Sequence, residues 1–325
     1  MQWDIIGLGC SSVDDFLYVS EFPGPDEKVA VRSHDRQCGG LTATALVTAS
    51  RLGAHCAYAG LLGRDELSRV VEENFRREGV DVSLAPRDPA ARVVYSLIVV
   101  AAATGSRNVF FQTNGRIGAH ESLPGEAVLR SARVLFLDQY GMAGNLRAAR
   151  IARSAGVAVV ADLEDDTDPR FNELLALVDH VILSEAFGRK ITGATSPQTA
   201  LERLWATDHL WDMDRQAVVM TCGAGGIWFS GTDRVPRYQP AFRVPAVDTT
   251  GCGDVFHGAY AAALIQGMPL AQRISFAAAA AALKATKPGG QRGIPTRGEV
   301  EGLLAASNTS AGIDRTTATM KPAVP

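Results

Sequence analysis

The segment Val247-Asp-Thr-Thr-Gly-Cys-Gly-Asp-Val-Phe-His-Gly-Ala259 decides how most of this 325-residue chain can be interpreted. It runs from the end of a short strand into an alanine-rich helix. Gly251 and Gly253 allow backbone N–H groups to turn toward one point without interference from a Cβ atom. Because that point lies at a helix N-terminus, where free amides and the helix dipole favour negative charge, the segment predicts an anion hole.

Asp254 follows these glycines directly, in the first turn of the predicted helix. Since a carboxylate binds anions poorly, its place beside an anion hole indicates a base that takes a proton from an attacking hydroxyl group. The alternative is a helix N-cap, in which the aspartate only satisfies free amides. The flanking residues, Asp248-Thr-Thr250 and Val255-Phe-His-Gly-Ala259, favour the catalytic interpretation.

The composition is that of a globular protein with a sizeable core, with 46% hydrophobic and 21% charged residues. A net charge of −3 argues against a generally basic surface that coats nucleic acid. The apolar runs are too short to span a bilayer, and the N-terminus lacks a signal-peptide pattern. Five scattered cysteines without zinc or disulfide spacing lead us to expect reduced thiols and a cytoplasmic location.

Strands and helices alternate through most of the chain, which predicts an α/β protein with a parallel sheet covered on both faces. The expected buried strands are residues 4–9, 55–62, 134–138, 157–162, 180–184 and 217–221. The last helices are expected at 252–266, 270–287 and 296–306. Residues 308–325 lack periodicity, so we expect a loose C-terminal tail.

Two hairpin-like segments, residues 11–37 and 92–118, interrupt this alternation. They predict a small β lid built from two separate insertions. The α/β domain would then consist of residues 1–10, 38–91 and 119–307. Because a lid of few strands leaves an apolar face unburied, we also expect the lid to form a homodimer contact.

The segment 247–259 resembles the C-terminal signature of the ribokinase-like (PfkB) carbohydrate kinases, usually DTxGAGD, with Cys252 in place of alanine. Three further segments resemble other motifs of this family and follow in the family's order. They are Gly9-Cys-Ser-Ser-Val-Asp14, Cys38-Gly-Gly-Leu-Thr-Ala-Thr44 and Thr221-Cys-Gly-Ala-Gly-Gly226. The resemblance covers residues 3–305 and implies a ribokinase-like three-layer α/β/α fold, Rossmann-like in its sheet, with a small β-sheet lid.

The resemblance implies an ATP-dependent kinase that transfers the γ-phosphoryl group to a hydroxyl of a sugar or sugar derivative. Asp254 would be the general base, and the amides of Gly251, Cys252 and Gly253 would hold the phosphoryl oxygens. Magnesium would accompany ATP, held by phosphates, water and carboxylates rather than by a dedicated metal site. The sequence shows no His/Cys cluster for a transition metal.

The same resemblance implies the binding residues of three further groups. The sugar-binding residues would be Asp14, Lys28, Gly39, Gly40 and Thr44, and the nucleotide-binding residues Ser184, Thr221, Gly223 and Gly226. Asp248, Thr250 and Gly289 resemble part of the family's loop for a monovalent cation, and the use of potassium stays open.

Within the family, the segments 43–44 and 282–295 most closely resemble the sulfofructose kinases, and residues 75–83 resemble the ketohexokinases. Some positions depart from the family pattern. Ser184-Glu-Ala-Phe187 stands where many members carry Asn-x-x-Glu. Leu41 and Thr44 replace asparagines that hold sugar hydroxyls, which counts against ribose and plain fructose.

Lys28 matches a lid lysine that would face a sulfonate, but Tyr140 and Gln112 stand at its expected partner positions. A full sulfonate clamp is therefore not expected, and Lys28 as a solvated lid lysine is equally open.

Other functions were weighed against these motifs. A Rossmann oxidoreductase fails because Ser12 occupies the third glycine position of GxGxxG after the first strand. A noncatalytic sugar-binding regulator would not need the carboxylate of Asp254. A nucleoside kinase of the same family, which would differ in its substrate, remains the alternative.

We expect His257 to pack or hydrogen-bond under the site and Cys252 to supply its amide rather than its thiol.

Overall fold

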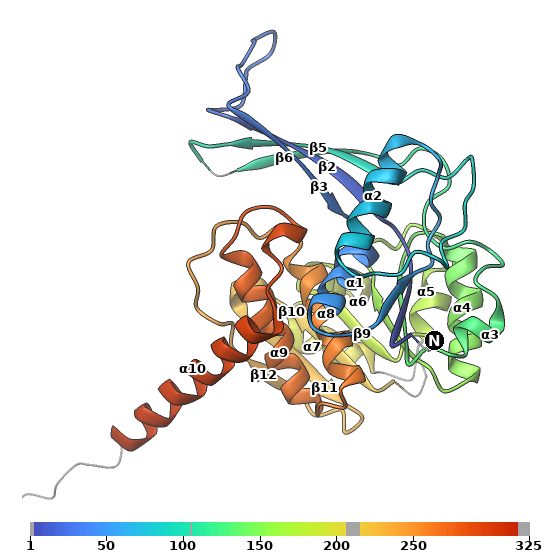
Figure 1. Cartoon of the computed structure of the whole chain (residues 1–325). Coiled ribbons are helices and arrows are strands. Elements are labelled where there is room, and N and C mark those ends of the chain that lie inside the picture. The colour runs from blue at the N-terminus through green and yellow to red at the C-terminus, as the bar shows by residue number, and fades with distance from the viewer. Residues whose placement is uncertain (1–2, 105, 206–214, 318–325) are drawn as a thin grey trace, which may run out of the picture.

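An eight-stranded sheet forms the body of the protein in the computed structural model, which describes residues 3–104, 106–205 and 215–317 (Figure 1). The strand order is β12-β11-β10-β9-β8-β7-β1-β4. From β4 to β10 neighbouring strands pair in parallel, and β11 and β12 add an antiparallel edge. The strands are β1 (Ile5–Leu8), β4 (Cys56–Tyr58), β7 (Val134–Asp138), β8 (Ala158–Asp162), β9 (His180–Ser184), β10 (Ala217–Thr221), β11 (Ile227–Gly231) and β12 (Arg237–Gln239).

Alternate side chains of each central strand enter separate cores on the two faces of the sheet. In β7, Val134 and Phe136 join one cluster, while Leu135 and Leu137 join the other. Helices cover both clusters, which confirms the predicted three-layer α/β/α class. The first cluster includes residues of α1 (Leu41–Arg51), α2 (Glu66–Arg77), α8 (Cys252–Ile265), α9 (Leu270–Ala285) and α10 (Arg297–Thr317), and the second includes residues of α3 (Glu126–Leu129), α4 (Met142–Ser154), α5 (Phe171–Ala176), α6 (Glu185–Thr192) and α7 (Pro197–Leu204).

A second sheet of four strands projects from the body (Figure 1). Its order is β3-β2-β5-β6, and its two hairpins are joined where β2 pairs in parallel with β5. The strands are β2 (Ser12–Val19), β3 (Ser33–Gly39), β5 (Val94–Ala101) and β6 (Arg107–Gln112). These strands come from the two segments that interrupt the alternation in the sequence, so we call this sheet the lid.

Some elements differ from the sequence-based expectation. The edge strands β11 and β12 and the short helix α6 were not expected, because short half-exposed elements carry little periodic signal. Helix α10 continues to Thr317, past the expected end at residue 306, so the described part of residues 308–325 is helical rather than loose. A helix that projects into solvent needs no apolar stripe (Figure 1). Residues 318–325 lie outside the described residues.

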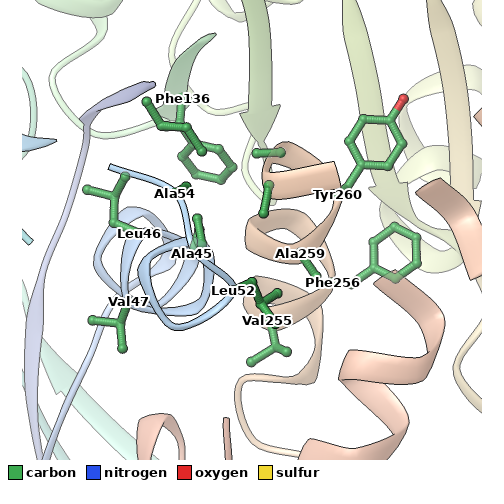
Figure 2. Packing of buried hydrophobic residues seen from close by; sticks show 14 of the residues in the cluster. Ala45, Leu46, Val47, Leu52, Ala54, Phe136, Val255, Phe256, Ala259 and Tyr260 are labelled. Atoms are coloured by element: carbon green, nitrogen blue, oxygen red, sulfur yellow. The ribbon is translucent and has the colours of Figure 1, made fainter. Parts of the chain in front are cut away.

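Close packing of α1 against α8 positions the segment that carries the signature motif. A Cβ atom at Gly258 would lie 2.2 Å from the carbonyl oxygen of Ala45, so glycine lets the two helix backbones touch. Figure 2 shows Val255 on the side of α8 that faces α1 and Phe256 on the opposite side of α8, and both belong to the buried cluster. Each such buried side chain stabilises the fold by about 1.5–3 kcal/mol, which anchors the N-terminus of α8.

The helices of the described ranges include none that is both long and apolar enough to cross a membrane.

Candidate active site

Four neighbouring parallel strands of the large sheet each end in a polar residue, and these ends meet at one edge of the sheet. These residues are Asp138, Asp162, Ser184 and Thr221, at the ends of β7, β8, β9 and β10. The register pairs Asp138 with Asp162, and Ser184 with Thr221. In open α/β sheets, ligands bind outside the carboxyl ends of the strands, so this edge is the expected location of a site.

The predicted anion hole falls at the N-terminus of α8, where the free amides differ in one position from those expected. Gly251 has a φ of 76°, a left-handed conformation that suits glycine. The Cys252 amide donates to the carbonyl oxygen of Thr249 at 3.2 Å, so it does not point freely outward as expected. Among the described residues, the amides of Gly251, Gly253 and Asp254 have no hydrogen-bond partner. These three amides, rather than that of Cys252, are free to bind an anion.

The Asp254 carboxylate lies in the first turn of α8 and is half-buried. It does not cap the helix, because α8 has no side-chain cap hydrogen bond. Burial raises the pKa of Asp254 well above its ordinary value, and the negative charges of Asp162 and Glu164 raise it further. Since no side-chain cap is formed, the N-cap interpretation of Asp254 is wrong, and its catalytic role stays a prediction.

His257 lies beneath Asp254 and is buried, as the sequence led us to expect. Its Nδ1 is 2.9 Å from the Gly253 carbonyl oxygen, and its Nε2 is 3.1 Å from that of Ile182. The Asp162 carboxylate lies 3.3 Å from Nδ1. Because both ring nitrogens contact the protein, His257 ties α8 to β8 and β9 instead of serving as a free acid.

Asp14 and Asp15 lie next to each other in β2 but point to opposite faces of the lid. Asp15 is buried and accepts two hydrogen bonds from Arg36, at 2.7 and 2.8 Å, and one from Tyr95 at 2.9 Å. Asp14 faces the site, where burial raises its pKa and hydrogen bonds from Ser96 and Ser12 oppose the rise. Its charge also reaches Asp254, whose pKa it raises.

The glycine pair between β3 and α1 is required by close contacts with these residues. A Cβ atom at Gly39 would lie 2.3 Å from Oδ2 of Asp14, so any side chain there would displace the carboxylate. Gly40 has a φ of 97°, and its Cβ would lie 2.7 Å from Cα of Ser11. Both positions therefore need glycine to keep Asp14 in place.

Two other predicted sugar-binding residues have different surroundings. The Thr44 hydroxyl is buried in α1 and accepts a hydrogen bond from Gln291 Nε2 at 3.2 Å, so it holds the loop after α9. Lys28 is exposed in the loop between β2 and β3. The substrate role of each remains a prediction.

The predicted nucleotide side lies at the ends of β9 and β10. Ser184 caps α6 by accepting the Phe187 amide, at 3.2 Å. Gly223 and Gly226 both have positive φ, of 54° and 83°, in the turn that follows Thr221. A Cβ at Gly226 would lie 2.5 Å from the Gln239 carbonyl oxygen, so this turn needs glycine for its own geometry.

The loop that follows α9 contacts both the signature segment and the lid. Asp248 accepts the amides of Thr250 and Gly289, each at 2.8 Å. From the lid, Gln37 accepts the Gly290 amide at 3.0 Å. Arg292 and Asp35 form an ion pair at 2.7 Å. The lid, the loop and the anion hole are therefore joined directly.

The pfkB family carbohydrate kinase model matches residues 6–297 of the chain. This protein is a member of the pfkB family of carbohydrate kinases. The assignment confirms the predicted enzyme class, a phosphotransferase that acts on an alcohol group, and favours a sugar kinase over a nucleoside kinase.

This family member is 29% identical to a ribokinase of Haemophilus influenzae over 306 residues, which cover 92% of this chain and 97% of the relative. It is 28% identical to fructokinase-1 of Oryza sativa over 290 residues, 82% of this chain and 88% of the relative. Its resemblance to the sulfofructose kinases remains a prediction.

Solved structures share the fold of this kinase. Arabidopsis thaliana ribokinase, complexed with ribose and ATP, superposes with a TM-score of 0.81 at 21% identity, covering 94% of this chain and 99% of that one. A structure from E. coli in complex with ATP and Mg²⁺ gives a TM-score of 0.79 at 18% identity, covering 94% of this chain and 99% of that one. These likenesses confirm the ribokinase-like α/β fold with its lid.

The sequence analysis of this kinase missed two groups of site residues. Asp138 and Asp162 carry a signal that was available, because each is the last, polar residue of an apolar strand. Burial raises the pKa of Asp138 to about 6, while its carboxylate accepts the Cys10 and Tyr140 amides. Lys284 carried no such signal, since it lies in the middle of an alanine-rich helical run.

Proposed function

We propose that this kinase transfers the γ-phosphoryl group of ATP to a hydroxyl of a sugar, with Asp254 as the general base. The observation that carries the proposal is an uncapped carboxylate beside three free amides at the N-terminus of α8. The amides of Gly251 and Gly253 bind the equatorial oxygens of the transferring group. Asp254 takes the hydroxyl proton as the new P–O bond forms and the bond to the ADP oxygen breaks.

The remaining predicted residues hold the two substrates around this point. Asp14 accepts hydrogen bonds from sugar hydroxyls, and Gly39 and Gly40 allow the backbone to approach the sugar. Thr221, Gly223 and Gly226 line the nucleotide side, with Ser184 at the neighbouring strand end.

The site suits magnesium that arrives with ATP. Asp162 and Glu164 gather negative charge beside Asp254, which a divalent cation on the phosphates would offset. Within the described ranges, no group of three or more His, Cys, Asp or Glu side chains could hold a metal by itself. Asp162 and Glu164 would therefore hold the ion together with phosphates and water.

ADP release tests the proposal when the protein is given ATP and a panel of sugars. The panel contains ribose, fructose, an anionic ketose derivative and, as the alternative class, nucleosides. We expect at least one sugar to produce ADP and phosphosugar in equal amounts. Because of Leu41 and Thr44, we expect poor turnover of ribose and fructose. If only a nucleoside were turned over, the protein would be a nucleoside kinase and the proposal would be wrong.

The raised pKa of Asp254 predicts the pH dependence of kcat/KM. The base acts only when ionised, so the acidic limb is expected above the ordinary aspartate pKa of about 4. Asp162→Asn removes a neighbouring negative charge, which lowers the pKa of Asp254 and moves the limb to lower pH. Asp166→Asn, whose half-buried carboxylate pairs with Lys190 at 2.6 Å, is the matched control and leaves the limb in place. A limb unaffected by Asp162→Asn would contradict this assignment.

We also propose that the lid forms a homodimer contact. The whole of β6 is exposed, and Phe110 and Phe111 are 59% and 66% exposed. Light scattering at micromolar concentration is expected to give a dimer mass for the native chain and a monomer mass for the Phe110→Asp/Phe111→Asp variant. Val235→Asp, at a 52% exposed site in the β11–β12 turn, is expected to leave the dimer intact. A monomeric native chain would overturn this proposal.

A cytoplasmic location fits the cysteines, all five of which are free and three of which are buried.

A further inference from the structure

Lys284 carries a buried ammonium group beside the anion hole. The side chain is 0% exposed, although Lys284 belongs to the last turns of α9. Its Nζ donates to the carbonyl oxygen of Asp248 at 2.8 Å. Burial lowers the pKa of Lys284, and the negative charges of Asp248 and Asp254 oppose that change. Burying a cation costs free energy unless neighbouring groups carry negative charge, so the buried Lys284 ammonium requires an explanation.

The oxygens of Asp248 already have donors. Its Oδ1 accepts the Thr250 amide and its Oδ2 accepts the Gly289 amide, both at 2.8 Å. Its carbonyl oxygen accepts the Lys284 ammonium. Potassium sites in proteins replace the hydration shell of the ion with several oxygens. Next to Asp248, the buried Thr250 hydroxyl oxygen has no hydrogen-bond partner.

A potassium ion bound next to Asp248 would lie close to the buried Lys284 ammonium and be repelled by it, so the residues present do not fit a potassium ion at the loop that resembles the family's cation site. The position next to Asp248 instead holds a positive charge that belongs to the chain itself. We propose that the Lys284 ammonium takes the place of a diffusible monovalent cation beside the anion hole, so that the enzyme works without potassium.

This arrangement gives the ammonium a positioning role. Its hydrogen bond fixes the carbonyl of Asp248, three residues before the positive-φ turn at Gly251. Its charge lies at the same helix N-terminus whose dipole favours the transferring phosphoryl group. A bound ion stabilises a protein to a degree that depends on its concentration, whereas a tethered charge is always present. The inference rests on the proposed function only where turnover is measured, since melting temperatures do not depend on it.

The native chain tests the proposal without any substitution. Turnover and thermal stability are measured in equal concentrations of potassium, sodium and choline chloride. We expect both to agree among the three salts, with turnover within about twofold, since no cation has to bind. A potassium requirement of the native enzyme, in turnover or in melting temperature, would overturn the proposal.

Lys284→Met removes the charge and keeps most of the side-chain volume. In choline chloride, we expect it to lose roughly 10- to 100-fold in turnover, the effect of removing a hydrogen bond from a charged group. Lys284→Ala also removes the charge but leaves room for an ion, so potassium, ammonium or methylammonium ions are expected to restore part of the turnover of this variant and to raise its melting temperature. The matched control is Lys287→Met, whose exposed ammonium pairs with Glu299 at 3.0 Å and which is expected to behave like the native chain. Lys284→Arg keeps a charge and is expected to remain unresponsive to potassium.

The readouts separate this inference from the proposed function. If no sugar in the panel is phosphorylated, the proposed function fails, while the melting temperatures in the three salts still test Lys284. A Lys284→Met variant that keeps full turnover in choline chloride, or a Lys284→Ala variant that does not respond to any of the cations, would overturn the role given to Lys284.

Discussion

Asp254→Asn is expected to lower kcat by roughly 10²- to 10⁴-fold, the usual contribution of a general base. The attacking hydroxyl is a weak nucleophile until its proton has an acceptor, and asparagine keeps the size of the side chain without accepting that proton. The free amides of Gly251 and Gly253 do not depend on the carboxylate, so nucleotide affinity is expected to change much less. Steady-state kinetics on the best sugar and calorimetric titration with ATP measure the two effects.

If Asp254 is not a helix cap, Asp254→Asn is expected to keep or raise the stability of the fold, whereas the loss of a cap would lower it. The pKa of Asp254 is raised in the folded state, so its ionised form opposes folding at every pH above the unfolded pKa of about 4. Asparagine removes that penalty, and the melting temperature at neutral pH is expected to stay equal or rise. Loss of a cap would instead cost about 1 kcal/mol. A lower melting temperature with near-native turnover would support a cap and contradict the catalytic role.

Asp14→Asn is expected to raise the KM for the sugar roughly 10- to 100-fold, because it weakens charged hydrogen bonds to sugar hydroxyls. The melting temperature at neutral pH is expected to stay equal or rise, since burial raises the pKa of this carboxyl and its ionised form therefore opposes folding. Initial rates over a range of sugar concentrations at saturating ATP give the KM. An unchanged KM would remove Asp14 from the sugar site.

The neighbouring Asp15→Asn variant is the matched control, because Asp15 points to the other face of the lid. The Arg36 guanidinium holds the pKa of Asp15 at about 2. This pairing stabilises the fold above the unfolded pKa of about 4 and is lost as the pH falls toward 2. Asp15→Asn is therefore expected to lower the melting temperature at neutral pH and to leave the sugar KM near its native value. If both variants raised the sugar KM equally, the effect of Asp14→Asn would come from a less stable lid and not from a lost contact with the sugar.

The layers of the fold could be predicted because apolar periodicity records them. Each central strand is a short apolar run, and side chains of such a run reach both faces of a covered parallel sheet. The two interruptions of that pattern predicted the strands of the lid. The end of α10 and the strand β12 could not be predicted in this way, since exposed elements have no apolar stripe. Strand β11 is mostly buried, but its five residues include a serine and a glycine and form no continuous apolar run.

The site was predictable where one continuous segment carries it. The glycines and the aspartate of residues 251–254 are adjacent in the sequence, so their roles could be derived before their geometry was known. The Cys252 amide donates to Thr249 within the same segment, but this depends on the exact backbone angles of the turn, which residue types alone do not fix. The ammonium of Lys284 lies beside Asp248, 36 residues away in the sequence, so this contact is tertiary and no pattern within a single segment records it.

The most direct test of the account is the rate of phosphoryl transfer itself, measured in a single turnover. The enzyme is in excess over ATP labelled in its γ-phosphate, the best sugar is saturating, and the native chain is compared with Asp254→Asn. If Asp254 is the general base, phosphosugar forms roughly 10²- to 10⁴-fold more slowly in the variant, although both substrates are bound. Transfer at the native rate by the variant with both substrates bound would contradict the central claim.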